Sequence, residues 1–156
     1  MKMRKGFTLV ELLIVIVIIG ILAAAMLLST TSATASAKAS TIITDLRSMK
    51  AALLLLYADS MDNMPAVTDA LQSLKNYIDN PKKYLATDSG FKIEAGTGAA
   101  AGKWIMSFAV KDKMQGSDLG DVKKKLAEKA EKVGLFKDTT ATDVYTDGDV
   151  VYMIGR

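Results

Sequence analysis

The sequence KMRKGFTLVELLIVIVIIGILAAAMLL, residues 2–28, decides how the rest of this chain is organised. The 17 residues from 12 to 28 carry no charge and no hydrogen-bonding side chain, and with residues 7–11 the segment reaches 22 residues. An α-helix needs roughly 17–25 residues to cross a bilayer core. Three cations precede Gly6 and favour a cytoplasmic N-terminus, namely Lys2, Arg4 and Lys5. The segment is therefore predicted to enter a membrane.

One carboxylate, that of Glu11, interrupts the apolar segment. An ionised carboxylate inside a membrane helix costs about 2.5–3.5 kcal/mol on insertion scales, so such a residue usually has a function and a partner. The next cation along the chain is Lys38, 27 residues away. Cutting the chain after Gly6 would leave Phe7 with a charged α-amino group four residues from Glu11. We therefore expect Glu11 to be functional, with this amine as its candidate charged partner.

Residues 5–15, KGFTLVELLIV, resemble the N-terminal processing motif of bacterial type IV prepilins and of the related pseudopilins, which is a class III signal peptide. The resemblance implies that a membrane prepilin peptidase cleaves between Gly6 and Phe7 and methylates the new Phe7 amine. It also implies that Glu11 neutralises the Phe7 amine of an adjacent subunit. Many pilins close their C-terminal region with a disulfide, and this chain departs from that pattern because it has no Cys.

Two other interpretations of the N-terminus remain open. An ordinary secretory signal peptide would be cut near the small residues 35–37, but 17 apolar residues exceed the usual 7–15 of its middle region. A carboxylate is also unfavourable there. The second alternative is a single-span anchor that keeps its leader.

Composition narrows the classes of function. The formal net charge of +3 comes from 20 cations and 17 anions. Residues 1–6 hold three of the cations and no anion, so the remaining chain carries 17 of each and has no net attraction to nucleic acid. The chain has no Cys and no His, which removes thiolate and imidazole ligands and the usual proton carrier near neutral pH. We expect no enzyme activity, no cofactor and no metal site.

Apolar residues continue along the helix after the membrane segment at alternating steps of four and three. This spacing places seven of them on one face of a helix: Ala35, Ala39, Ile42, Leu46, Met49, Leu53 and Leu56. A two-stranded coiled coil is the weaker interpretation, because well-placed charge pairs are missing. We expect residues 7–58 to form one helix, with residues 7–28 as membrane segment and filament core, packed on a head formed by residues 59–156.

The head is predicted to be α+β. A short helix over 69–78, capped by Thr68, precedes strands at 91–95 and 103–110 that are joined by a flexible loop. A second helix starts at Ser117 or Asp118 and ends at Gly134. Residues 144–154 alternate around Asp147-Gly148 and predict a hairpin with a tight turn. The expected fold is a long N-terminal helix packed against a small antiparallel sheet with short helices.

Three further stretches resemble binding sites only weakly, and a solvated surface is the better interpretation of each. Gly98 to Lys103 lacks the spacing of a phosphate loop. Asp143, Asp147 and Asp149 could gather calcium, as some pseudopilins do near the C-terminus, but their spacing does not fit a twelve-residue calcium loop. Residues 123–125, three lysines, could contact DNA, but with acids nearby they are more typical of a solvated helix face.

The resemblance implies a structural subunit, and we expect the major pilin of a bacterial type IV pilus. Its partners would be further copies of itself, the prepilin peptidase and methyltransferase, the pilus assembly platform and minor pilins. The precursor would sit in the cytoplasmic membrane as a single-pass protein before joining an extracellular fimbrial filament at the cell surface. The alternative is a pseudopilin of a type II secretion or DNA-uptake system, and a third possibility is a tethered binding protein that never polymerises.

Overall fold

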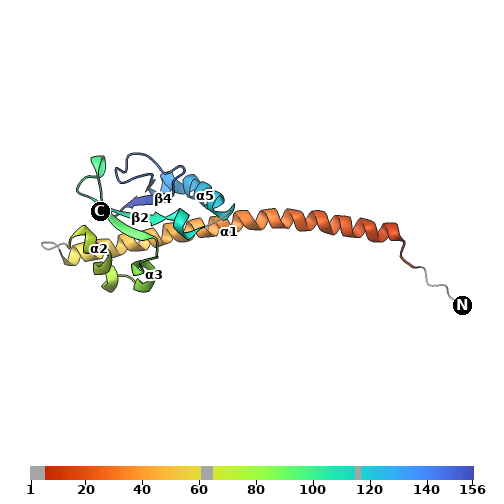
Figure 1. Cartoon of the computed structure of the whole chain (residues 1–156), viewed down its shortest axis with the longest axis horizontal. Helices are drawn as coiled ribbons and strands as arrows, with labels where there is room; N and C mark the ends of the chain where they lie inside the picture. The colour runs from red at the N-terminus through yellow and green to blue at the C-terminus, as the bar shows by residue number, and fades with distance from the viewer. Residues whose placement is uncertain (1–5, 61–64, 115–116) are drawn as a thin grey trace. The chain divides into compact units, whose positions relative to one another are not determined.

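The computed structural model describes residues 6–60, 65–114 and 117–156, without the side chains of residues 28, 29 and 117 (Figure 1). The chain divides into two compact units, Met1–Thr34 and Ala35–Arg156, which we call the N-terminal unit and the head unit. Helix α1, Leu9–Asp59, contributes to both units. It begins two residues later and ends one residue later than the predicted 7–58.

The N-terminal unit consists, in its described part, of the first half of α1 and the three residues before it. Its large apolar side chains are exposed, from Leu9 at 80% to Leu27 at 70%, and Leu13 to Ile18 stay above 50%. The helix is long and apolar enough to cross a membrane. Nothing within the described unit shields these side chains from solvent, so their burial depends on the surroundings.

The head unit contains a four-stranded antiparallel sheet in the order β1-β2-β4-β3. The strands are β1 (Phe91–Ala95), β2 (Trp104–Ala109), β3 (Leu135–Phe136) and β4 (Val150–Ile154). One row across the sheet joins Ile93, Met106, Met153 and Leu135, and all four side chains are buried. The long helix, the small antiparallel sheet and the short helices confirm the predicted α+β fold.

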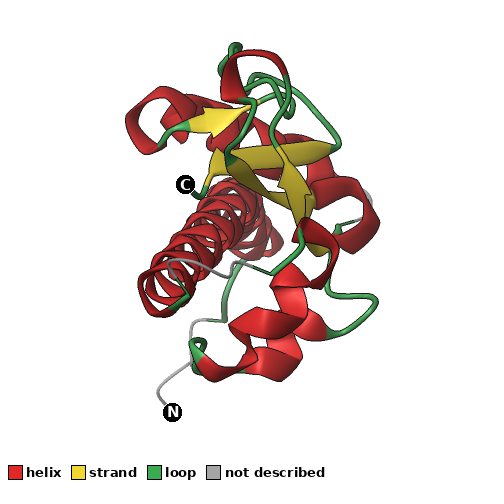
Figure 2. Cartoon of the chain, turned by 90° about the vertical axis from the view of Figure 1, so that its left-hand side faces the viewer, coloured by secondary structure: helices red, strands yellow, loops and turns green. Residues whose placement is uncertain are grey.

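The sheet lies over one side of the C-terminal half of α1, as Figure 2 shows. All seven helix positions that the spacing placed on one face are buried: Ala35, Ala39, Ile42, Leu46, Met49, Leu53 and Leu56. Helix α5 (Ser117–Val133) completes this core with Val122, Leu126 and Ala130, none of which is exposed. It ends as predicted, because Gly134 has a φ of 76°, which favours glycine.

The short helices differ from the predicted pattern. Helix α2 (Val67–Ser73) begins after Ala66, so Thr68 lies inside the first turn and does not cap it; a 3₁₀ turn, η1 (Leu74–Asn76), follows. A helix absent from the predicted pattern, α3 (Pro81–Leu85), starts at Pro81. Proline suits this position because it lacks the donor that the first helical position leaves unused. Helix α4 (Val110–Lys113) follows β2 directly, and the loop predicted to be flexible contains η2 (Gly98–Ala100).

The predicted hairpin around Asp147-Gly148 is wrong. Strand β4 pairs with β2 and with β3, whereas Val144 makes only an isolated bridge to Phe136. Tyr145 is instead held by the rest of the head, because its side chain is buried and its backbone N–H donates to the Leu135 carbonyl at 3.0 Å. Its hydroxyl donates to the nearby Gly148 carbonyl at 2.8 Å. A local turn signal is therefore overruled by packing of one aromatic residue.

Candidate functional site

The predicted site residues lie at the start of α1. The Thr8 backbone N–H and the Thr8 hydroxyl each donate to Oε2 of Glu11 at 2.8 Å, and the Glu11 N–H donates to the Thr8 hydroxyl at 3.3 Å. This reciprocal arrangement is a capping box, in which the residue before the helix and the third helical residue satisfy donors that the first turn leaves free. Thr8 and Glu11 therefore fix where the helix begins.

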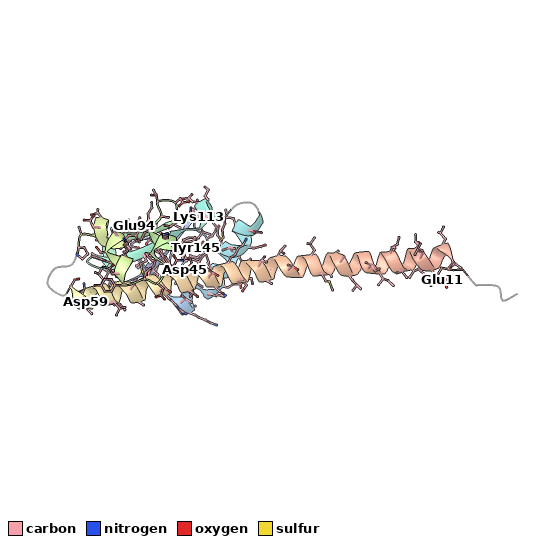
Figure 3. The ribbon with its side chains drawn as sticks, turned by 90° about the horizontal axis from the view of Figure 1, so that it is seen from below. Glu11, Asp45, Asp59, Glu94, Lys113 and Tyr145 are labelled. Carbon is pink, nitrogen blue, oxygen red and sulfur yellow. The ribbon has the colours of Figure 1, made fainter. Side chains whose placement is uncertain are left out.

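Among the described residues no cation compensates the charge of the Glu11 carboxylate. Within the described part of the chain its partner is Thr8 alone, Oε1 accepts no hydrogen bond, and no cation pairs with it. Figure 3 shows Glu11 close to the start of α1. Phe7 beside it is 93% exposed, and both residues line an open hollow of about 590 Å³. The site can therefore accept a further donor or cation from outside.

The site suits a primary or methylated amine. A charged amine at Phe7 would lie next to the positive end of the helix, where cations are unfavourable. A carboxylate in the first turn offsets that cost, and Glu11 is placed there. A charge-assisted hydrogen bond from an amine is about twice as strong as a neutral one.

Sequence reasoning placed Gly6, Phe7 and Glu11 but missed Thr8. In the structure Gly6 and Phe7 lie outside α1, separated from its first residue, Leu9, by Thr8. The sequence does contain a signal for Thr8. A capping box has the pattern of Thr followed three residues later by Glu at the start of an apolar run, as at Thr8 and Glu11. Glu11 therefore has a neutral partner within its own chain in addition to the charged one expected from a cut after Gly6.

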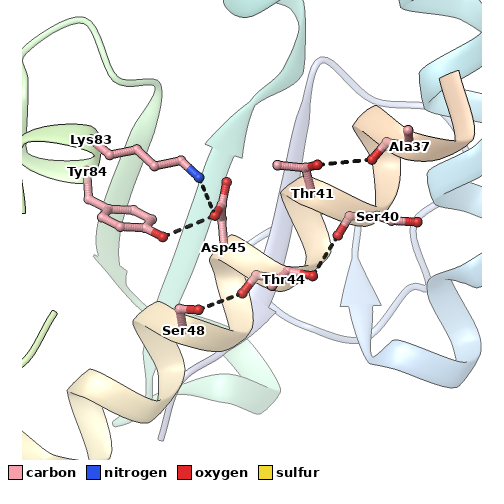
Figure 4. A network of polar contacts seen from close by, with 8 residues as sticks. All are labelled: Ala37, Ser40, Thr41, Thr44, Asp45, Ser48, Lys83 and Tyr84. Carbon is pink, nitrogen blue, oxygen red and sulfur yellow. Dashed lines mark hydrogen bonds and ion pairs between the residues drawn. The ribbon is translucent and has the colours of Figure 1, made fainter. Parts of the chain in front are cut away.

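A second acid on α1 has a different environment (Figure 4). Asp45 is 7% exposed, and its Oδ1 accepts hydrogen bonds from Lys83 Nζ at 2.6 Å and from the Tyr84 hydroxyl at 3.0 Å. Burial, and then the nearby Asp45 carboxylate, raise the pKa of Tyr84 to about 12. Because both partners come from α3, this contact attaches α3 to α1.

Two of the three acids considered for calcium, Asp147 and Asp149, are held by lysines. Asp149 accepts from Lys123 at 2.8 Å and from Lys111 at 3.3 Å, and Lys123 also pairs with Asp147 at 3.5 Å. These hydrogen bonds lower the pKa of Asp149. Among the described residues no group of three acids is placed to hold a metal ion. The cations beside Asp147 and Asp149 are the ammonium groups of Lys123 and Lys111.

The three lysines 123–125 do not act together. Lys123 turns toward the loop before β4, whereas Lys125 pairs with Glu128 on its own helix at 2.8 Å. The Gly98 to Lys103 stretch contains η2, whose Ala100 is buried. Lys123, Lys125 and Ala100 therefore take part in structural contacts.

The chain resembles known proteins at its N-terminus. Residues 1–27 match the family model of the prokaryotic N-terminal methylation motif, which supports the class III signal peptide of type IV pilins and pseudopilins. The motif implies processing by a prepilin peptidase, and with the apolar helix it suits a membrane-anchored precursor. No curated protein and no solved structure matches the chain.

Proposed function

We propose that this chain, whose first 27 residues carry the methylation motif, is the major structural subunit of a type IV pilus. The prepilin peptidase would cut between Gly6 and Phe7, methylate the Phe7 amine, and leave residues 7–156 as the mature subunit. The mature chain would wait in the cytoplasmic membrane and then enter an extracellular filament of identical copies. It acts as a building block and not as an enzyme.

The observation that carries this proposal is the state of Glu11. Its carboxylate is oriented by Thr8, yet no described cation neutralises it, and it stands at the start of an exposed apolar helix. A plain membrane anchor gains nothing from such an acid, because insertion of the charge is unfavourable. An incoming Phe7 amine from a second copy would supply the missing charge.

The assembly mechanism follows from a change of surroundings. The apolar side chains of the N-terminal unit avoid water both in lipid and in a bundle of identical helices, so their transfer need cost little. The transfer stabilises Glu11 more than the apolar side chains, because the hydrogen bonds from Thr8 orient its carboxylate but do not neutralise its charge. Pairing with the amine of a neighbour offsets that charge, sets the axial register and makes the contact specific for processed copies.

The head favours a pilus over a calcium-dependent pseudopilin. Lys123 places a fixed positive charge between Asp147 and Asp149, where it opposes a divalent cation. A pseudopilin of a secretion or DNA-uptake system that does without calcium stays compatible with this feature. Electron microscopy of the cell surface separates the two functions, because only the pilus forms long fibres that can be sheared off.

The decisive experiment changes Glu11 to Ala and compares fibres sheared from the cell surface with the membrane pool. We expect fibre yield to fall at least about tenfold, the effect of losing roughly 1.4 kcal/mol or more at each subunit contact, while processed subunit persists in the membrane. Intact mass and the N-terminal residue of wild-type fibres should show a chain that starts at methylated Phe7.

Two controls make the result specific. Lys124→Ala, at an exposed position far from this site along the chain, should leave fibre yield unchanged. Gly6→Glu should leave a precursor whose mass still includes residues 1–6. Normal fibres from Glu11→Ala cells, or a mature chain that starts elsewhere than Phe7, would contradict the proposal and favour a tethered protein that never polymerises.

A further inference from the structure

A hollow of about 400 Å³, which we call the head hollow, opens on the surface of the head unit. Helices α1, α3 and α4 and strands β1 and β2 all contribute residues to its lining. Sites for small molecules in proteins are clefts of roughly 300–1,000 Å³ with mainly apolar walls and a few polar groups. The head hollow has a suitable size for such a ligand, and it lies in a different unit from Glu11.

The apolar part of the lining includes two aromatic rings. The rings of Phe91 and Phe108 lie with their centroids 4.6 Å apart and their planes inclined by 44°, and both residues are buried. Ile42, also buried, and the partly buried Met114 line the same hollow and pack in the same core. Aromatic side chains pack favourably against a further ring in offset or edge-to-face arrangements. The lining therefore suits a ligand with an aromatic body.

The hydroxyl groups in the lining already have partners. The Thr41 hydroxyl donates to the Ala37 carbonyl at 3.1 Å, and the Ser89 hydroxyl donates to the Tyr84 carbonyl at 2.7 Å. A donor that is paired within the chain does not need a hydrogen bond from a ligand. These hydroxyls therefore do not determine which ligand the hollow accepts.

Two of the three lysines in the lining are neutralised by carboxylates of the chain. Lys38 forms an ion pair with Asp118 at 2.5 Å, and Lys83 forms one with Asp45 at 2.6 Å, as Figure 4 shows for Lys83. Charges paired at these distances are poorly available to an incoming ion. Neither lysine therefore adds a free positive charge to the hollow.

Lys113 is the lysine of the lining that lacks a close carboxylate. Its Nζ is 3.9 Å from Oδ2 of Asp88, which is beyond hydrogen-bond distance, and the Asp88 side chain is 91% exposed. Gly90 has a φ of 82°, and a Cβ there would lie 3.0 Å from Cγ of Lys113, so the glycine leaves room for the lysine stem. An ammonium group in this state can donate a charge-assisted hydrogen bond to an anion.

We propose that the head hollow binds a small aromatic carboxylate. Its ring would lie against Phe91 and Phe108, and its carboxylate would accept a hydrogen bond from Lys113. One negative charge on the ligand complements the one ammonium group of the lining that has no close partner. The inference goes beyond the proposed function and does not depend on whether the chain forms fibres.

The test follows methyl groups of the hollow by NMR while 2-naphthoate is added. The full-length chain, with labelled isoleucine and methionine methyl groups, is held in nanodiscs of phosphatidylcholine, which avoids competition from detergent. We expect saturable shifts of the Ile42 and Met114 methyl groups, because the naphthalene ring would lie beside them. The methyl groups of Ile154, which does not line the hollow, should not shift.

The charge of the probe and the charge of the lysine are then varied together. The neutral analogue 2-naphthalenemethanol should bind the wild-type chain at least about tenfold more weakly, the effect of losing roughly 1.4 kcal/mol. Lys113→Gln should weaken 2-naphthoate to the affinity of the alcohol, whereas Lys113→Arg should retain binding within about threefold, because arginine also donates to carboxylates. Lys124→Gln, at an exposed position of α5, is the matched control and should bind like wild type.

Three results would overturn the inference. The first is the absence of saturable shifts at Ile42 and Met114. The second is equal affinity for the carboxylate and the alcohol, or unchanged affinity for 2-naphthoate in Lys113→Gln. The third is a shift of the same methyl groups when the chain is concentrated without the probe, which would indicate that a second copy covers the hollow. Each of these results leaves the proposed role of Glu11 intact.

Discussion

The two halves of α1 have the same backbone structure but opposite relations to the rest of the chain. In the N-terminal unit Leu12 is 62% exposed and Ile16 is 57% exposed, whereas in the head unit Leu46 and Leu53 are fully buried. The head half is completed by the chain's own sheet and α5. The first half is completed by nothing that the structure describes in this chain. One helix thus combines an element of a folded domain with an element that needs an external apolar environment.

The two acids on α1 repeat this contrast. Asp45 has both an ammonium and a phenol from its own chain, whereas the described partner of Glu11 is the neutral Thr8. An acid whose charge is paired by a cation of its own chain contributes to the stability of the fold. An acid held in place without a counter-ion is available for a partner.

The largest expected change in stability comes from Leu46→Ala. Truncating this fully buried side chain should lower the free energy of unfolding by about 2–5 kcal/mol, because a cavity adds to the lost apolar burial. Leu54→Ala, at an exposed position of the same helix, should change the free energy of unfolding by no more than about 0.5 kcal/mol. Urea unfolding of the full-length chain in detergent, followed by the single tryptophan, Trp104, measures both. Similar losses in the two variants would break the comparison.

Asp45→Ala should have the next largest effect, about 1–3 kcal/mol in the same assay, which is typical for hydrogen bonds to a charged group. The Lys83 side chain is 43% exposed and can turn to water, but the Tyr84 hydroxyl stays in a buried residue without this acceptor. Glu11→Ala is the matched acid on the same helix and should leave unfolding of the head unchanged. A destabilised head in Glu11→Ala would show that the two halves are not independent.

A smaller effect should appear at alkaline pH. The folded pKa of Tyr84 lies at about 12, above the ordinary value of 10.0, because of burial and then Asp45. Its contribution to stability is therefore complete below pH 10.0 and is lost as the pH rises toward about 12. The difference in ultraviolet titration between wild type and Tyr84→Phe should show one phenol ionising late. Ionisation near the ordinary value would indicate that the Asp45 contact does not form.

The smallest effect is expected from Lys123→Met, which removes the ammonium between Asp147 and Asp149. The folded pKa of Asp149 is lowered by hydrogen bonds from Lys123 and Lys111, so their contribution is present above its ordinary pKa and is lost as pH falls through the folded pKa. The melting temperature should drop slightly at neutral pH, and the gap to wild type should narrow in acid. Lys124→Met is the control and should show neither change.

Much of the fold could be predicted because its signals are local. The alternating steps of four and three fixed the buried face of α1, and alternation located β1 at 91–95, as observed. The segment around Tyr145 could not be predicted, because burial of its side chain and its backbone hydrogen bond to Leu135 overrule a good local turn signal there. Strand β3 has two residues, too few for any periodicity.

The same division holds for the site. Gly6, Phe7 and Glu11 stand in a motif that is contiguous in sequence, and Thr8 could have been added from its spacing to Glu11. The partners of Asp45 could not be found this way, because Lys83 and Tyr84 lie 38 and 39 residues further along. Side chains that meet only after folding leave no trace in a local pattern.

The strand order also constrains when the head can fold. Strand β4 lies between β2 and β3, although it is the last of the four to be synthesised. A ribosome stalled before Val150 would therefore display two strands that lack their shared neighbour. Leu53 of the earlier helix, whose side chain lies against Gly155, would also lack part of its cover. Long-range pairing of this kind slows folding and prolongs the exposure of hydrophobic surface and unpaired strand edges. A nascent chain of this protein should thus need protection by chaperones until its final strand emerges.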